Sequence, residues 1–260
     1  MKTVLCVGGS DPSGGAGIQS DIPAVLAHDC FPLSAITSLT SQNSQGVYDV
    51  FTPDPHVLRD QLEVLSKDYN IDAVKIGMLG SPENVKVMVN FILDNGLGNI
   101  VVDPIFKSSS GFNLISQEGF NLIKEKLLPL TTVVTPNIEE AEYLSQINIK
   151  TAEDMMAAAK TISEGGAGFV IIKGGHLSGD SSSDIVLDEN GISAITSEKL
   201  RQDLRGTGCL FSSSLAANLA KGLSLIESAR KSKDFVTKMI KNGFQLGEGK
   251  MQVTSFKEKN

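Results

Sequence analysis

The chain has 260 residues, of which 41% are hydrophobic and 20% charged, and its 30 acidic and 23 basic side chains give a net charge of −7. This is the composition of a globular protein with one large α/β domain or two small ones. The acidic balance argues against nucleic acid as a partner, and no apolar run reaches the length of a membrane helix.

The three cysteines, Cys6, Cys30 and Cys209, are widely spaced, and the sequence contains neither a CxxC pair nor a Cys/His cluster. It therefore indicates neither a disulfide framework nor a zinc site. The apolar stretch in MKTVLCVGGS is too short for the core of a signal peptide, and we expect a cytoplasmic protein.

Short apolar, β-branched runs alternate with longer helical patterns along the chain. Strands that are apolar throughout and separated by helices predict a parallel sheet buried on both faces. Because we find no internal repeat, low-complexity linker or composition break, we expect residues 1–260 to form a single domain. The runs predict strands at 3–7, 34–39, 72–76, 99–102, 132–134 and 169–172, and the patterns predict helices at 21–28, 55–68, 82–94, 116–127, 137–145, 151–164, 208–221 and 224–242.

Two segments interrupt this alternation. GVYDVFTP, residues 46–53, is predicted to be a flap or an edge strand. SDIVLDENGISAITSEKL, residues 183–200, has two alternating runs around Asn190-Gly191, and Asn-Gly is a strong signal for a β-hairpin.

The first predicted strand leads into a glycine-rich loop, GGSDPSGGAGIQSD, residues 8–21. Its glycines allow a ligand to approach the backbone closely, but its spacing matches neither a Walker loop nor a dinucleotide fingerprint. Pro23 fits best in the first turn of a helix, so we expect that helix to begin near Asp21. Asp21 is then the N-cap, a ligand acceptor or both.

Further polar groups follow the other predicted strands, where ligands of open parallel sheets bind. Each has a simpler interpretation: Gln42 and Asn43 as turn formers, Asp103 as a turn cap, Glu140 as a residue of a helix's first turn, and Lys173 as a solvated lysine. Because all of them are predicted at one rim of the sheet, a shared site is the stronger interpretation. The segments are TSQNS (40–44), VKIGML (74–79), VVDPIF (101–106), VTPNIEEAEYL (134–144) and IIKGGHL (171–177).

The segment RGTGCLFSSSLAANLAKG, residues 205–222, places Cys209 after two glycines at a predicted helix start. Unpaired N–H groups at a helix start attract anions, and a thiol there can lose its proton more easily than a free one. The segment predicts an anion site with a reactive group beside it. The alternative is a glycine turn followed by a small buried cysteine.

The segments GGSDPSGGAGIQSD, VKIGMLGS, VVDP, TPNIEEAE, KGGHL and GTGC, in this order, resemble the ribokinase-like superfamily. The resemblance is closest to the hydroxymethylpyrimidine/phosphomethylpyrimidine kinases of thiamin biosynthesis, which are related to pyridoxal kinases, and it spans residues 3–222. It implies a three-layer α/β sandwich with a mostly parallel central sheet between helices. It also implies transfer of the γ-phosphoryl group of ATP to a hydroxymethyl group, with Mg²⁺ as cofactor.

The resemblance also implies roles for individual residues. Cys209 occupies the general-base position, where many sugar kinases of the superfamily have aspartate, and Lys173 matches a lysine near the phosphates. The amides of Gly206, Thr207 and Gly208 resemble the anion hole. The resemblance further implies nucleotide and metal binding by Asp103 and Glu140, nucleotide binding by Asn137, Lys173 and Thr207, and binding of the pyrimidine by Gly9, Asp21, Gln42 and Met78.

The sequence departs from the family pattern at four places. Ser109 stands at a position that is usually lysine, with Lys107 two places earlier, and Arg205 stands where histidine is common. Pro23 interrupts a helix that usually lacks proline, and the tail GEGKMQVTSFKEKN keeps its glycines but loses a Gly-Pro-x-His pattern. Arg205 could strengthen the phosphate site or indicate a different acceptor.

We expect ATP and a small pyrimidine as partners, and a homodimer. Two alternative functions stay open: a pyridoxal or pyridoxine kinase, and a homologue that binds a vitamin precursor without turnover. Whether one or both phosphorylation steps are catalysed also stays open.

Overall fold

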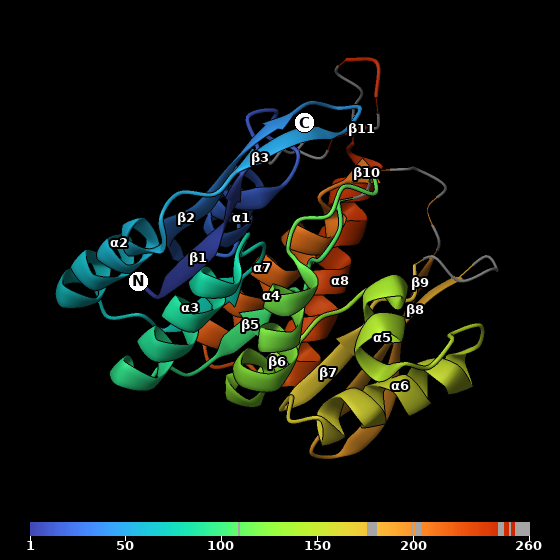
Figure 1. The fold of residues 1–260 in the computed structure, drawn as a ribbon. Helices are drawn as coiled ribbons and strands as arrows, with labels where there is room; N and C mark the ends of the chain where they lie inside the picture. Colours follow the sequence, from blue (N-terminus) through green and yellow to red (C-terminus); the bar gives the residue numbers. More distant parts are fainter. Residues whose placement is uncertain are drawn as a thin grey trace.

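The computed structural model describes residues 1–108, 110–175, 181–198, 200, 204–243, 247–249 and 251–252. Its centre is a sheet in the order β3-β2-β1-β4-β5-β6-β7-β8-β9 (Figure 1). β1, β2 and β4 to β7 run parallel, whereas β3, β8 and β9 pair antiparallel with their neighbours. The strands are β1 (Thr3–Ser10), β2 (Phe31–Gln42), β3 (Val47–Phe51), β4 (Ala73–Ile76), β5 (Ile100–Val102), β6 (Val133–Val134), β7 (Phe169–Ile172), β8 (Ser181–Asp188) and β9 (Gly191–Glu198).

Helices cover both faces of this sheet (Figure 1). α1, α7 and α8 pack on one face, and α2 to α6 pack on the other. The expected three-layer α/β sandwich with a mostly parallel sheet is confirmed. The helices are α1 (Gly17–Leu26), α2 (Pro55–Asp68), α3 (Pro82–Asn95), α4 (Gln117–Leu122), α5 (Ile138–Ser145), α6 (Ala152–Glu164), α7 (Thr207–Ala220) and α8 (Leu225–Lys241).

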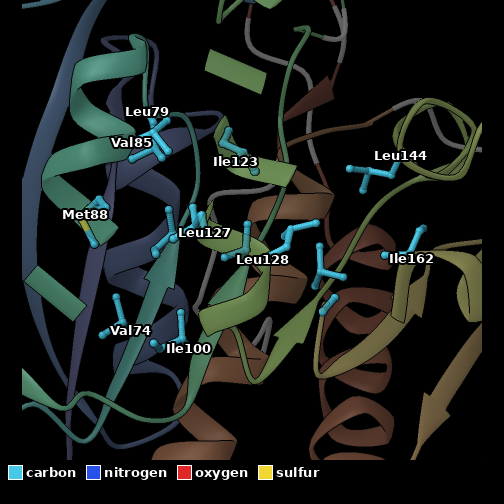
Figure 2. Close-up of a cluster of buried hydrophobic side chains, with 14 of the residues drawn as sticks. Val74, Leu79, Val85, Met88, Ile100, Ile123, Leu127, Leu128, Leu144 and Ile162 are labelled. Atoms are coloured by element: carbon cyan, nitrogen blue, oxygen red, sulfur yellow. The ribbon is translucent and has the colours of Figure 1, made fainter. Parts of the chain in front are cut away.

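The two helix layers enclose separate hydrophobic cores because successive strand residues point to opposite faces. In β1, Leu5 and Val7 belong to the core under α2 to α6, whereas Val4 and Cys6 belong to the core under α1, α7 and α8. Figure 2 shows the first core, in which side chains of β4 and β5 meet those of α3 and the segment after α4. The continuous apolar runs are therefore explained by burial on both sides.

The predicted elements are present, and most of their bounds agree to within a few residues. GVYDVFTP contains the edge strand β3, and the predicted hairpin is β8–β9, in which Asp188 pairs with Gly191. The predicted helix 116–127 is divided into α4 and a π-helical turn at Ile123–Leu127. A separate two-stranded parallel sheet joins β10 (Leu204–Arg205) to β11 (Met251–Gln252).

The predicted start of the first helix is wrong. α1 begins at Gly17 after the extended residue Ala16, so Asp21 is not the N-cap and Pro23 lies inside the helix. Burial of Ile18, Asp21 and Val25 on the sheet explains the longer helix, because tertiary packing can outweigh the local cost of a proline.

No helix among the residues described is both long and apolar enough to cross a membrane.

Candidate active site

A cavity of about 710 Å³ opens at the carboxyl ends of the parallel strands. It lies where the strand order reverses, since β1 has β2 on one side and β4 on the other, and ligands of open α/β sheets bind at such a point. All the predicted site residues except Asp21 line this cavity: Gly9, Gln42, Met78, Asp103, Asn137, Glu140, Lys173, Gly206, Thr207, Gly208 and Cys209.

The N-terminus of α7 forms one end of the cavity. Gly206 precedes the helix with a φ of 79°, and a Cβ there would overlap the carbonyl oxygen of Gly15. A Cβ on Gly208 would lie 3.2 Å from Lys173 Nζ and 3.4 Å from Asp103 Oδ2. The amides of the first helical turn have no acceptor within the helix. Glycines thus leave room for a ligand beside a positive helix end, an arrangement that suits an anion.

Cys209 lies in this first turn with only 7% of its surface exposed. Burial raises the pKa of its thiol to about 11, although Lys75 and the amide of Gly17 act in the opposite direction. The expectation that this thiol loses its proton more easily than a free one is therefore wrong, because desolvation outweighs the effects of Lys75 and the Gly17 amide. At neutral pH the thiol is protonated.

Lys173 and Asp103 form an ion pair at the centre of the rim, with Lys173 Nζ 2.8 Å from Asp103 Oδ1. Burial opposes the positive charge of Lys173, but attraction to Asp103 and Glu140 raises its pKa above the ordinary value. Lys173 is thus held as a cation beside the start of α7. The interpretation as a solvated loop lysine does not fit this position.

Asn137 and Glu140 form a capping box at the start of α5. The amide of Glu140 donates to the side-chain oxygen of Asn137 at 2.9 Å, and the amide of Asn137 donates to Glu140 Oε2 at 2.8 Å. Glu140 therefore belongs to the first helical turn and also lines the cavity. Burial raises the pKa of this carboxyl to about 8, with Lys173 lowering it and Asp103 raising it.

These groups fit a magnesium–phosphate ligand. Mg²⁺ takes oxygen ligands, and in phosphate sites it commonly uses one or two carboxylates and fills its other positions with phosphate oxygens and water. Asp103 and Glu140 supply two buried carboxylates beside Lys173 and the α7 amides. Within the described part of the chain, no three or more His, Cys, Asp or Glu side chains are placed to hold a metal by themselves.

The opposite end of the cavity is formed by the first loop and the ends of β2 and β4. The Met78 sulfur lies 3.0 Å from the point where a Cβ on Gly9 would stand, so the thioether packs directly against the backbone of Gly9. The Thr40 hydroxyl lies between two acceptors, the carbonyl oxygen of Ser10 at 2.9 Å and Gln42 Oε1 at 3.1 Å, and shares its one hydrogen between them. A planar ligand would meet an apolar thioether and a side-chain amide here.

Asp21 lies beneath the cavity wall and not on it. It is fully buried, and its two carboxylate oxygens each lie 2.9 Å from Lys75 Nζ, with Ser213 Oγ donating to one of them at 2.8 Å. Lys75 itself lines the cavity. The oxygens of Asp21 are thus occupied by protein groups.

Sequence reasoning did not single out Lys75. It stands on the face of β4 that points toward α1 and α7, between residues of the opposite core. Burial opposes its charge, but Asp21 outweighs this effect and raises the pKa of Lys75. A charged residue inside the apolar run AVKI was the available signal, since a buried lysine requires an opposite charge.

Two of the four departures from the family pattern are described in full, and the tail is described in part. Pro23 lies inside α1, and Arg205 is buried on the cavity wall in an ion pair with Asp11. Ser109 and residues 176–177 of KGGHL lie outside the described residues, as do residues 250 and 253–260 of the tail. The described tail glycines approach the β2–β3 turn, where the amide of Gly249 donates to Ser44 Oγ at 3.2 Å.

Comparison with known proteins gives consistent matches over most of the chain. The family model described as phosphomethylpyrimidine kinase matches residues 11–254. A hydroxymethylpyrimidine/phosphomethylpyrimidine kinase of Aquifex aeolicus is 38% identical over 94% of this chain and 96% of its own.

Two solved structures show the same fold. The phosphomethylpyrimidine kinase of Clostridium difficile has a TM-score of 0.81 at 34% identity and covers 92% of this chain and 99% of its own. The pyridoxal kinase of Staphylococcus aureus in complex with AMP-PCP and pyridoxal has a TM-score of 0.89 at 34% identity, and the match covers 97% of this chain and 93% of that kinase.

Proposed function

The chain belongs to the phosphomethylpyrimidine kinase family and is a kinase of thiamin biosynthesis, and from this premise we propose that its acceptor is 4-amino-5-hydroxymethyl-2-methylpyrimidine or the monophosphate of that compound. The observation that carries the proposal is the cavity itself. It unites an anion-binding helix end, a buried lysine–aspartate pair and a thioether–amide wall at the carboxyl edge of one sheet.

At the phosphate end, the chain's own groups stabilise negative charge. The amides of Thr207 and Gly208 and the ammonium of Lys173 face the same space and compensate charge that develops during phosphoryl transfer. Bound ATP supplies the phosphoryl group, and Mg²⁺ neutralises its phosphates. Asp103 and Glu140 are the residues that would hold this ion and its waters.

Cys209 is the proposed base for the hydroxymethyl acceptor. As the hydroxyl oxygen forms its bond to the γ-phosphorus, the bond from that phosphorus to the ADP oxygen breaks, and the hydroxyl proton passes to the thiolate of Cys209. Lys75 and the Gly17 amide favour this thiolate, whereas burial disfavours it. A thiolate formed in such a site is a strong base and a minor species at neutral pH.

At the acceptor end, Gln42 is proposed to recognise the aminopyrimidine. A side-chain amide can donate to a ring nitrogen and accept from the adjacent amino group. Met78 contacts the ring face, and Gly9 lets the ring approach the backbone. Asp21 acts on the site through Lys75 and Ser213, since these two residues occupy its carboxylate.

Pyridoxal is the second candidate acceptor, favoured by the similarity to the S. aureus pyridoxal kinase. Its ring lacks the paired nitrogen–amine edge of the pyrimidine. The Gln42→Leu variant therefore separates the two candidates. We expect it to lose about 10- to 100-fold in pyrimidine affinity, since it leaves polar groups of the ligand unpaired, and much less in pyridoxal affinity.

Titration calorimetry with both ligands on wild type and Gln42→Leu measures this difference. Equal losses for the two ligands, or no loss for the pyrimidine, would remove Gln42 from the acceptor site.

Measurement of ADP formation tests whether the protein is an enzyme or only binds a vitamin precursor. Purified protein is incubated with ATP and magnesium, with each acceptor and without one, and ADP is quantified. We expect ADP only when an acceptor is present. Tight acceptor binding without ADP formation would instead identify a non-catalytic homologue.

A further inference from the structure

Arg205 stands where histidine is common in the family, directly before Gly206 and the start of α7. Its side chain is only 4% exposed and lines the cavity. Arg205 Nη2 lies 3.2 Å from Asp11 Oδ2, and Nη1 donates to the carbonyl oxygen of Asn43 and to Ser13 Oγ, the latter at 3.4 Å. The guanidinium therefore joins the first glycine loop, the β2–β3 turn and the start of α7.

These contacts leave part of the guanidinium available. Arginine has five N–H groups, and the three contacts use two on Nη1 and one on Nη2. The Nε hydrogen and the second Nη2 hydrogen meet no acceptor within the described ranges. Since the side chain forms part of the cavity wall, a ligand oxygen is the natural partner for these donors.

Among the described residues, the other three cations that line the cavity are also paired with carboxylates, but they lie elsewhere on its wall. Lys75 is 1% exposed and is bound by both oxygens of Asp21, and Lys173 pairs with Asp103 at the phosphate end. Lys107 lies 3.4 Å from the exposed carboxylate of Glu139. Of these four cations, Arg205 is the one that contacts the first glycine-rich loop and also directly precedes the start of α7.

The two candidate acceptors differ in the charge that must be held at this point. The hydroxymethyl compound is neutral at its reacting group, whereas its monophosphate carries up to two negative charges, since the second pKa of a phosphate is near 6. Arginine binds phosphate oxygens through paired N–H groups and stays charged at all relevant pH values.

We propose that Arg205 binds the phosphate of the monophosphate acceptor and thereby determines how efficiently this cavity phosphorylates the monophosphate relative to the hydroxymethyl compound. This inference rests on the proposed function. An oxygen of the acceptor phosphate forms a bond to the γ-phosphorus of ATP, and the bond from that phosphorus to the ADP oxygen breaks. The product is a diphosphate ester. The dianionic acceptor has no proton to lose, so this step depends on Arg205 and not on a base.

The first phosphorylation has the opposite dependence, because its neutral hydroxyl must lose a proton to Cys209. We therefore expect the ratio of kcat/KM for the monophosphate to kcat/KM for the hydroxymethyl compound to fall about 10- to 100-fold in Arg205→Gln and to rise in Cys209→Ala. Arg205→Lys keeps the charge but loses the paired geometry, and its ratio falls less.

Asp11→Asn is the matched control. It removes the ion pair with Arg205 and perturbs the first loop, in which Asp11 accepts from Ser13 and Gly15, but it leaves the cation in place, so the ratio does not fall. If Arg205 merely clamps the loop, Arg205→Gln and Asp11→Asn lower both activities in parallel and the ratio stays at the wild-type value. That result overturns the inference.

The single Arg205 variant leaves the buried Asp11 without its partner and can lose stability for that reason. The double variant Asp11→Asn/Arg205→Gln removes both charges and is expected to show the same lowered ratio, with thermal unfolding as the check on folding.

A wild-type protein that phosphorylates the hydroxymethyl compound but not its monophosphate also overturns the inference and leaves the proposed function intact. Failure of the wild type with every acceptor would contradict the proposed function itself.

Discussion

At the residue scale, Cys209 combines a position at the start of α7 with a thiol that burial keeps protonated. If its thiolate accepts the hydroxyl proton, Cys209→Ala lowers kcat by about 10²- to 10⁴-fold, the range for loss of a general base, with little change in KM. Cys30→Ala is the matched control, because Cys30 is also buried but does not line the cavity. Near-normal turnover of Cys209→Ala would return this cysteine to the role of a small buried residue.

The same thiol predicts a pH dependence. Because its pKa is raised to about 11, the thiolate fraction increases with pH throughout the neutral and mildly alkaline range. Where proton transfer limits turnover, kcat for the hydroxymethyl acceptor rises by up to about tenfold per pH unit between pH 7 and 9. Steady-state rates across this range test the expectation. A flat profile in wild type would argue against a cysteine base.

Glu140 gives a prediction for magnesium. Burial raises its pKa to about 8, and a metal ion binds the ionised carboxylate, so the free magnesium needed for half-maximal activity falls as pH rises from 7 to 9. Glu140→Gln cannot ionise, and we expect it to need about tenfold more magnesium with less pH dependence. Magnesium titrations at several pH values make the comparison. Identical titrations for the two proteins would leave Glu140 with its capping role alone.

At this scale the sequence identified most of the cavity wall, because polar residues next to glycine or proline at strand ends are recognisable one by one. It did not predict that Asp21 pairs with Lys75, since 54 residues separate them and only the packing of α1 on β4 brings them together. It also misjudged the acidity of Cys209, because the depth of burial is not visible in a local motif.

At the element scale, the backbone at the two ends of α7 requires glycine. Gly206 and Gly222 flank this helix with φ values of 79° and 83°, so an alanine at either position is strained by about 1–2 kcal/mol. A Cβ at Gly206 would also overlap the Gly15 carbonyl, whereas a Cβ at Gly222 meets nothing within 4 Å.

We therefore expect Gly206→Ala to lose more thermal stability than Gly222→Ala, because only Gly206→Ala adds the overlap to the φ strain. We expect a loss of turnover of at least about tenfold in Gly206→Ala alone, because a displacement near 1 Å can cost about 10²-fold. Melting curves and turnover are measured on both proteins. Equal turnover in the two would mean that the contact between the first loop and α7 does not set the geometry of the site.

Elements that are buried on both faces were the most predictable ones, because their composition is uniform over their length. α1 was misplaced because the proline rule considers only local geometry, while Ile18 and Val25 gain burial on the sheet by extending the helix toward Gly17. The edge strand β3 stayed ambiguous in the sequence, since Tyr48 and Phe51 are exposed and give it no clear apolar face.

At the scale of the whole molecule, the central sheet explains how a site forms from segments far apart in the chain. Parallel strands place all their carboxyl ends at one edge, and the reversal of order at β1 opens a cavity there. The sequence allowed the prediction of this edge as the site. The pairing order and the register, which decide that Lys75 faces α1 and α7, depend on packing over the whole domain.

We propose above all that this cavity phosphorylates a hydroxymethylated aminopyrimidine. The most direct measurement compares kcat/KM for 4-amino-5-hydroxymethyl-2-methylpyrimidine and for pyridoxal on the same protein at one ATP and magnesium concentration. Because two hydrogen bonds to Gln42 are open only to the pyrimidine, we predict a preference for it of at least about tenfold. Equal values, or a preference for pyridoxal, would contradict the claim.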